Sequence, residues 1–249
     1  MKLVVELIKS DLAKLADPVK AKHSQKFFKT GPGEYGFGDA FLGITVPEQR
    51  KVAKKYTKIA TLSDIQKLLN SPFHEHRLTA LIILVQKYES NQNTTHKKEI
   101  VEFYLSNTGN INNWDLVDTT AHKILGDWCL LKQDYSEMYR LIESGYLWNV
   151  RIAVISNLRL VHEGEFGVAL DICKLVINYD HDLIHKASGW VLREIGKQDK
   201  EVLRNFLDAH AKHMPRTMLR YALEKFSKQE RNDYLKQVPN NDKKVLDVM

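Results

Sequence analysis

Cysteine, glycine and proline are scarce in this sequence of 249 residues. The two cysteines, Cys129 and Cys173, are too few for a disulfide scaffold or a multi-cysteine zinc site. The alternation of apolar and polar residues that marks β-strands is nearly absent, and no stretch approaches the roughly 18 uninterrupted apolar residues of a membrane span. Glu6 and Lys9 break the apolar run at the N-terminus, which argues against a signal peptide. We therefore expect a soluble, intracellular protein.

Apolar residues recur instead at spacings of three and four, the period of a helix that is buried on one face. This pattern is clearest in residues 65–69, 78–85, 101–105, 152–160 and 170–177. Turn signals such as Asn70-Ser-Pro72 and Pro239-Asn-Asn241 separate the helical segments. Thr61-x-x-Asp64 resembles a capping box at the start of a helix. The sequence therefore predicts an all-α protein.

The predicted helices are expected in pairs, because a loose pattern recurs in the second helix of each pair. A polar or charged residue followed by Ala and aliphatic positions occurs at Arg77, Asp118, Arg151, Lys186 and Arg216. The spacings are 41, 33, 35 and 30 residues, which is the range of two-helix solenoid repeats. We predict an α-solenoid that forms a single domain over residues 1–249, with the Gly-rich residues 29–39 as a loop or insertion.

Positive charge dominates the repeated position. Four of the five repeats carry Lys or Arg there, and the whole chain has 37 Lys and Arg against 31 Asp and Glu, for a formal net charge of +6. A single cation at a helix start is ordinarily solvated surface. Its repetition favours a concave basic face that binds nucleic-acid phosphates.

Several kinds of chemistry find no support in the sequence. Residues 31–36 match the spacing of a dinucleotide-binding loop, but they follow a helix-like segment instead of a strand. The pairs His74-x-His76 and His181-x-x-x-His185 lack a third metal ligand. We expect no cofactor and no metal ion.

Trp114 and Asp118 are four residues apart, so a helix places both on one face. Asp115 lies to one side and is positioned to cap the helix start. Core packing would explain the tryptophan, and an ion pair with an arginine would explain Asp118. A carboxylate on a cationic surface also fits a role in stabilising a cation that forms during a reaction.

A second segment combines cations with an indole. Lys186, Trp190 and Arg193 share one helix face, and Arg216 and Arg220 are four residues apart. Together with Arg77 and Arg151, these five positions supply the candidate phosphate contacts and a second tryptophan on the predicted concave face.

Four segments carry a resemblance to a known family. They read Phe41-Leu-Gly-Ile44 followed by Pro47-Glu-x-Arg50, Trp114-Asp-x-Val-Asp118, Trp148-x-x-Arg151-x-Ala153, and Lys186-Ala-x-Gly-Trp-Val-Leu-Arg-Glu194. Together they resemble the AlkD-type DNA alkylation repair family of HEAT-like-repeat DNA glycosylases, over roughly residues 27–226. The chain departs from the family pattern at Thr45, where Gln is frequent, at Phe27, where Tyr occurs, and in residues 29–39, which resemble an insertion.

The resemblance implies a solenoid of HEAT-like helix pairs that grips duplex DNA. It implies hydrolysis of the N-glycosidic bond of N3- or N7-alkylated purines without a pocket for a flipped base. By resemblance, Asp118 is the catalytic carboxylate, Trp114 and Trp190 contact the deoxyribose of the lesion, and Arg151 holds a phosphate. No lysine is assigned as a Schiff-base nucleophile, so a monofunctional enzyme is expected.

The expected partner is double-stranded DNA that contains alkylated purines. We expect Lys186, Arg193, Arg216, Arg220 and Arg77 to bind DNA together with Arg151. We further expect a cytoplasmic, nucleoid-associated monomer without a membrane partner. Two alternatives remain open, namely a non-catalytic HEAT-like solenoid that binds duplex or branched DNA and a protein-interaction scaffold.

Overall fold

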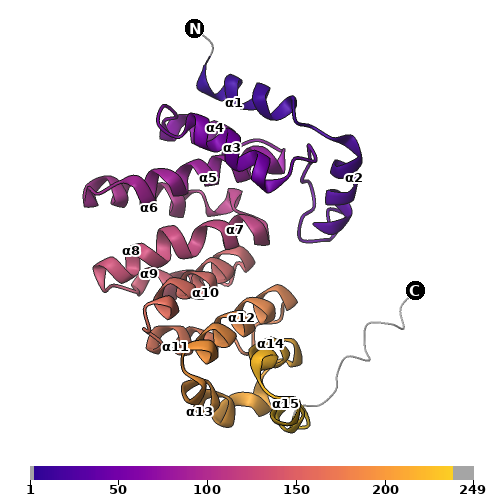
Figure 1. The fold of residues 1–249 in the computed structure, drawn as a ribbon, viewed down its shortest axis with the longest axis vertical. Coiled ribbons are helices and arrows are strands. Elements are labelled where there is room, and N and C mark those ends of the chain that lie inside the picture. The colour runs from indigo at the N-terminus through magenta and orange to yellow at the C-terminus, as the bar shows by residue number, and fades with distance from the viewer. Residues whose placement is uncertain (1–2, 238–249) are drawn as a thin grey trace. The chain divides into compact units, whose positions relative to one another are not determined.

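A computed structural model of the protein describes residues 3–237, and the turn predicted at residues 239–241 lies outside this range. The described residues form helices joined by short turns and loops, without a strand (Figure 1). Ala40 and Phe73 pair in an isolated parallel bridge. Within residues 3–237, no helix is both long and apolar enough to span a bilayer. The all-α class was predicted correctly.

The chain divides into two compact units, with the boundary between Trp128 and Cys129. The single continuous domain therefore stays a prediction. The helices of the first unit are α1 (Val4–Ala13), α2 (Pro18–Phe27), α3 (Val46–Tyr56), α4 (Leu62–Leu69), α5 (His74–Ser90), α6 (Thr94–Ser106), the 3-10 helix η1 (Thr108–Asn110), α7 (Trp114–Ala121) and the π-helix η2 (His122–Gly126). Residues 29–39 form successive turns and bends.

The helix α8 (Asp127–Lys132) contains the boundary. The helices of the second unit are α9 (Ser136–Glu143), α10 (Leu147–His162), α11 (Gly167–Leu175), α12 (Asp182–Gln198), α13 (Lys200–His210), η3 (Ala211–His213), α14 (Arg216–Ala222), η4 (Leu223–Lys225) and α15 (Lys228–Leu235). All five segments with helical periodicity are helical, although α11 ends two residues before the predicted end of its segment.

Local sequence signals explain where several helices begin. The Thr61 side chain accepts a hydrogen bond from the Asp64 amide, and the Asp64 carboxylate accepts one from the Thr61 amide. This reciprocal pair satisfies two amides that the first turn of a helix leaves unpaired, so the predicted capping box at α4 is confirmed.

The repeat pattern predicted which helices are equivalent. The five repeated positions fall within the first five residues of α5, α7, α10, α12 and α14. Inside the first unit α5 packs on α7, and inside the second unit α10 packs on α12 and α12 packs on α14 (Figure 1). Each unit is therefore built as stacked helix pairs, as expected for an α-solenoid.

Gly189 permits a close contact between two of these helices. A Cβ atom at Gly189 would lie 2.5 Å from the Met218 carbonyl oxygen and 2.5 Å from Cβ of Tyr221, both on α14. The glycine in the Gly-Trp-Val-Leu-Arg-Glu segment therefore serves the packing of α12 against α14.

Both cysteines are buried. Cys129 in α8 and Cys173 in α11 are free thiols with almost no exposed surface. Burial raises the pKa of the Cys129 thiol to about 12, and burial raises that of Cys173 as well.

Candidate active site

The candidate site of the first unit is built on α7. The Asn113 side chain caps this helix by accepting a hydrogen bond from the Trp114 amide at 2.8 Å. Trp114 and Asp118 follow in the first and second turns, and both side chains are half-buried. The expectation that Asp115 caps the helix was wrong, because its carboxylate instead bonds the Leu116 amide and the His74 imidazole. The sequence signal for the true cap was Asn113, since Asn is one of the preferred residues directly before the first residue of a helix.

Trp114 lies at the edge of a group of aromatic side chains. Its indole stacks on Phe28, with ring centroids 5.2 Å apart and an interplanar angle of 20°, and meets the edge of Phe27 at 5.8 Å. Phe28 in turn stacks on Phe41. The Phe27 side chain is 58% exposed. The indole is therefore held by ring contacts on one side while part of its surface faces solvent.

His74, the first residue of α5, lies under this aromatic group between two carboxylates. Its Nε2 is 2.8 Å from Oδ2 of Asp115, and its Nδ1 is 3.2 Å from Oδ2 of Asp39. Asp39 also pairs with the Arg77 guanidinium at 2.7 Å and accepts a hydrogen bond from the Asn113 side chain at 3.4 Å. We call these five residues the His74 cluster.

The electrostatics of the His74 cluster favour its charged forms. Burial opposes a charge on His74, but the carboxylates of Asp115 and Asp39 outweigh it and raise the pKa of the imidazole to about 9. Burial also opposes ionisation of Asp39, yet hydrogen bonds from His74 and Arg77 hold the pKa of that carboxyl below its usual range. The sequence had presented His74 only as half of a weak metal-ligand pair.

The helix changes its geometry directly after α7. Residues 122–126 form the π-helix η2, a rare element that is frequently found at functional sites. The imidazole of His122 is largely enclosed there, and burial lowers its pKa to about 4. The turn of α7 that carries Asp118 is therefore followed by a π-helical turn, and the α-helix does not continue unchanged.

In the second unit, Trp190 lies on α12 with its indole half-buried. The indole Nε1 donates a hydrogen bond to Oε1 of Glu194, which also accepts hydrogen bonds from Arg193 and Lys197. Trp148 on α10 differs, since it is 4% exposed and belongs to the core. Of the tryptophans in the family-like segments, Trp114 and Trp190 therefore retain accessible surface.

Three repeated cations hold backbone carbonyl groups. Arg77 is 6% exposed, and besides its ion pair with Asp39 its Nη1 lies 3.5 Å from the Ser71 carbonyl oxygen. Arg151 is 4% exposed and donates to the Leu183 carbonyl oxygen in the first turn of α12. Arg216 donates to the carbonyl oxygen of Leu235 at 3.1 Å.

These contacts correct the reading of the repeated position as surface charge. For Arg77 the enclosed guanidinium, which neutralises Asp39, favours a structural role over the expected phosphate contact. At three of the five repeated positions the arginine therefore contacts a carbonyl group of another segment, which a guanidinium with five N–H donors is suited to do. The roles of the other cations in DNA binding stay predictions.

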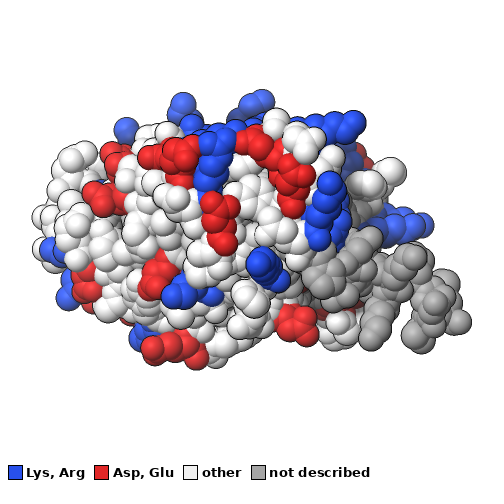
Figure 2. All heavy atoms as spheres, turned by 90° about the horizontal axis from the view of Figure 1, so that it is seen from below, with Lys and Arg blue, Asp and Glu red and all other residues white. Residues whose placement is uncertain are grey.

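The remaining candidate cations are closer to solvent. Lys186 pairs with Asp182 at 2.6 Å, and Arg193 pairs with Glu194 and Glu224. Arg220 is exposed, and no carboxylate of residues 3–237 forms an ion pair with it. Basic and acidic side chains are interspersed on the face shown in Figure 2. Phosphate would therefore compete with carboxylates for several of these cations.

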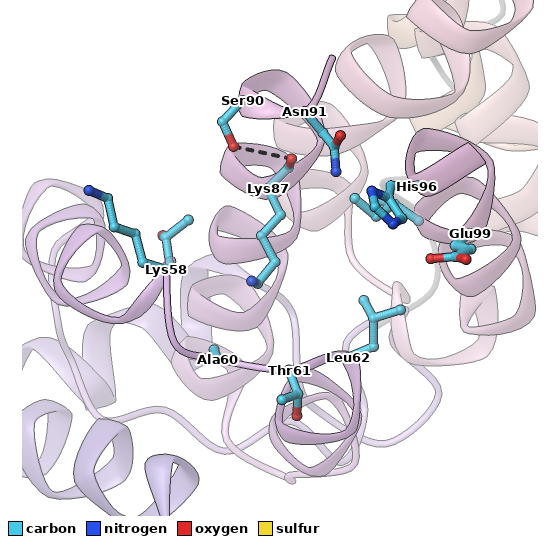
Figure 3. A pocket seen from close by; sticks show the side chains of 11 residues that line it. Lys58, Ala60, Thr61, Leu62, Lys87, Ser90, Asn91, His96 and Glu99 are labelled. Carbon is cyan, nitrogen blue, oxygen red and sulfur yellow. Dashed lines mark hydrogen bonds between the residues drawn. The ribbon is translucent and has the colours of Figure 1, made fainter. Parts of the chain in front are cut away.

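A separate open cavity of about 510 Å³ lies at the other end of α5 (Figure 3). Lys87 and Ser90 from the last turns of α5 line it together with Thr61 and His96. Lys87 lies 13 residues after His74, so at about 1.5 Å of rise per residue roughly 20 Å of helix separate this cavity from the His74 cluster. Among residues 3–237, no three His, Cys, Asp or Glu side chains form a group that would hold a metal ion.

Comparisons with known proteins agree with the fold and with the family-like segments. The family described as DNA alkylation repair enzyme matches residues 8–226. The chain is similar to a solved structure described as "Predicted DNA alkylation repair enzyme from Enterococcus faecalis", with a TM-score of 0.66 and 18% sequence identity over 86% of this chain and 97% of that one. No curated protein matches it. Because the family match spans most of its length, this chain belongs to the DNA alkylation repair enzyme family.

Proposed function

We propose that the protein is a monofunctional DNA glycosylase that hydrolyses the N-glycosidic bond of N3- or N7-alkylated purines in duplex DNA. Family membership supports the broader role in alkylation repair. The observation that carries the finer proposal is the arrangement on α7, where a half-exposed indole and a carboxylate are one turn apart. A HEAT-like solenoid that only binds duplex or branched DNA has no evident use for the carboxylate of Asp118.

The proposed reaction needs a stabilised cation and no acid. A purine alkylated at N3 or N7 is already positive, so it takes the electron pair of the breaking bond and leaves as a neutral base. The deoxyribose becomes an oxocarbenium-like cation, which the Asp118 carboxylate stabilises. Water then adds to C1′ and gives up one proton, for which Asp118 is the acceptor. The reaction uses no flipped-base pocket and no cofactor.

The indoles have a matching role. An aromatic face attracts a nearby cation by about 0.5–2 kcal/mol, depending on how well water is excluded. We propose that Trp114 contacts the deoxyribose of the lesion and that Trp190 makes the same kind of contact from α12. Arg151 would hold a phosphate, with Lys186, Arg193, Arg216 and Arg220 as further phosphate contacts.

The decisive experiment measures release of 7-methylguanine and 3-methyladenine from methylated duplex DNA. The variants are Asp118→Asn and, as a matched control, Glu102→Gln, which alters an exposed carboxylate of α6 in the same unit. We expect Asp118→Asn to lose at least about 100-fold in rate while it remains folded and binds DNA, and Glu102→Gln to match the wild type. Base release by Asp118→Asn at the wild-type rate would refute the role of Asp118. DNA binding without base release by the wild type would favour the non-catalytic solenoid.

A further inference from the structure

The two carboxylates beside His74 place a requirement on its protonation state. A neutral imidazole has one N–H donor and one lone pair, whereas an imidazolium has two donors. His74 faces Oδ2 of Asp115 at 2.8 Å from one ring nitrogen and Oδ2 of Asp39 at 3.2 Å from the other. In the neutral form, a ring lone pair would face a carboxylate oxygen inside a buried site. With both carboxyl groups ionised, the two contacts are satisfied together only by the imidazolium.

The surroundings of His74 agree with a bridging cation. The side chain is 2% exposed, and its ring packs against both Phe41 and Phe28, with centroid distances of 4.8 Å and 4.9 Å. Three charged groups face it: Asp39 from the segment before α3, Asp115 from α7, and Arg77 from α5 itself. With His74 protonated, two positive groups balance two negative groups, and the buried cluster has no net charge.

One of the two carboxylates that His74 contacts belongs to α7, the helix that carries Trp114 and Asp118. Asp115 directly follows Trp114 in the first turn of α7, and its other carboxylate oxygen accepts a hydrogen bond from the Leu116 amide. Asp39 also accepts a hydrogen bond from Asn113, the cap of α7. His74 therefore ties the start of α5 to the start of α7 through both of its ring nitrogens.

We propose that His74 is a positioning residue: as an imidazolium it bridges Asp39 and Asp115 and so fixes the first turn of α7. That turn holds Trp114 and leads into Asp118, so this inference rests on the function proposed above. Loss of the imidazole proton replaces one attraction by a repulsion and loosens the turn. Base release then falls as the pH rises through the range in which His74 deprotonates.

One test needs neither DNA nor activity. Protein labelled with 5-fluorotryptophan is titrated from pH 6 to 10.5, and the Trp114 fluorine resonance is assigned with Trp114→Phe. We expect this resonance to shift with a midpoint near pH 9 in the wild type. His74→Gln, which carries an amide that does not titrate, should lack the transition. A Trp114 resonance that does not move, or that moves identically in His74→Gln, would overturn the proposal.

Two variants with an amide side chain at position 74 distinguish positioning of the α7 turn by His74 from a general contribution of His74 to stability. The His74→Gln amide reaches the place of Nε2, which faces Asp115, and the His74→Asn amide reaches the place of Nδ1, which faces Asp39. If the bond to α7 positions the site, His74→Asn should lose roughly 100-fold in base release and His74→Gln clearly less. Equal losses in two variants of equal thermal stability would contradict the proposal.

Asp115→Asn provides a readout in which the histidine is retained. Removing the nearest carboxylate lowers the proton affinity of His74, so the alkaline loss of base release should move down by roughly one to three pH units. An unmoved pH profile in this variant would contradict the bridge. If the wild type releases no base at any pH, the proposed function fails, and the fluorine titration still decides whether His74 forms the bridge.

Discussion

The indole of Trp190 is tied to Glu194, one turn further along α12, by a hydrogen bond of 3.0 Å from Nε1 to Oε1. Arg193 and Lys197 bond the same carboxylate, so its position is fixed from three sides. Burial opposes ionisation of Glu194, but hydrogen bonds from Lys197 and Arg193 keep its pKa below the ordinary range. The acceptor for the indole is therefore ionised at neutral pH.

We predict that Glu194 sets the orientation of the Trp190 indole during catalysis. Glu194→Ala removes the acceptor and should lower base release roughly fivefold, the equivalent of one hydrogen bond of about 1 kcal/mol. Glu194→Gln retains an acceptor oxygen and should lose less. The measurement is single-turnover release of 7-methylguanine, and wild-type rates in both variants would contradict the prediction.

Salt dependence distinguishes phosphate-binding cations from structural ones. A plot of the logarithm of the DNA-binding constant against the logarithm of the salt concentration has a negative slope. Arg220→Ala, which removes an exposed cation, should make this slope shallower by about one unit. Arg77→Met should leave this slope unchanged, because the Arg77 guanidinium is enclosed beside Asp39. Both expectations are tested by measuring duplex binding with fluorescence anisotropy between 50 and 200 mM salt, roughly the range over which phosphate contacts change the affinity strongly. A shallower slope for Arg77→Met would show that Arg77 contacts a phosphate after all.

Gly43 should be intolerant of any side chain. It has φ of +81°, and an added Cβ atom would lie 2.1 Å from the Asp17 carbonyl oxygen and 2.5 Å from the Ala21 amide nitrogen. Its amide also donates a hydrogen bond to the buried Glu75 carboxylate at 2.7 Å. Gly43→Ala should therefore lower the free energy of unfolding by more than about 3 kcal/mol.

Gly33 offers the matched control for this substitution. Its φ is +78°, but nothing lies within 4 Å of an added Cβ atom. Gly33→Ala should cost about 1–2 kcal/mol from backbone strain alone. The difference between the two variants in unfolding free energy, measured with urea, gives the steric part of the Gly43 effect. Equal losses of unfolding free energy would show that the backbone of α2 moves away to make room for the added Cβ atom.

Acid should weaken the first unit through its buried neutral histidines. Burial lowers the pKa of His76 to about 4 and that of His122 to about 4, whereas the unfolded chain takes up these protons near pH 6.5. The unfolded state therefore binds more protons between these values, and the free energy of unfolding falls as the pH falls from 6.5 to 4.

The contribution of His122 is measurable by substitution. His122→Gln should flatten the decline in unfolding free energy across this pH range by an amount on the order of 1–3 kcal/mol. His96→Gln, which alters an exposed ring on α6, should leave the decline unchanged. Urea unfolding at pH 4.5, 5.5, 6.5 and 7.5, roughly spanning the ordinary titration of histidine, provides the comparison.

Local and periodic features were predictable from the sequence. Helical periodicity predicted the all-α class, and Thr61 and Asp64 predicted a capping box. The repeated position marks helices that pack on one another within each unit, such as α10 on α12 and α12 on α14. These features are readable because each depends on residues within a few turns of one another. The placement of Trp114 and Asp118 on one helix was predictable for the same reason.

The His74 cluster was not predictable, because its members are brought together by tertiary structure. Asp39, His74 and Asp115 are 35 and 41 residues apart, and no periodic pattern links them. The burial of Arg77 was missed for a related reason, since a cation at a helix start is ordinarily solvated and only its buried partner changes that. The bond between Arg151 and Leu183 likewise depends on the packing of two helices.

The protonated, enclosed thiols of Cys129 and Cys173 have a consequence for a protein of alkylation repair. Methylating reagents attack sulfur chiefly as the thiolate anion and only where they can reach it. With both sulfurs buried, the chain offers no thiolate to methylating reagents of the kind that damage DNA. Methylation of a cysteine should therefore not be a route by which such reagents inactivate this protein.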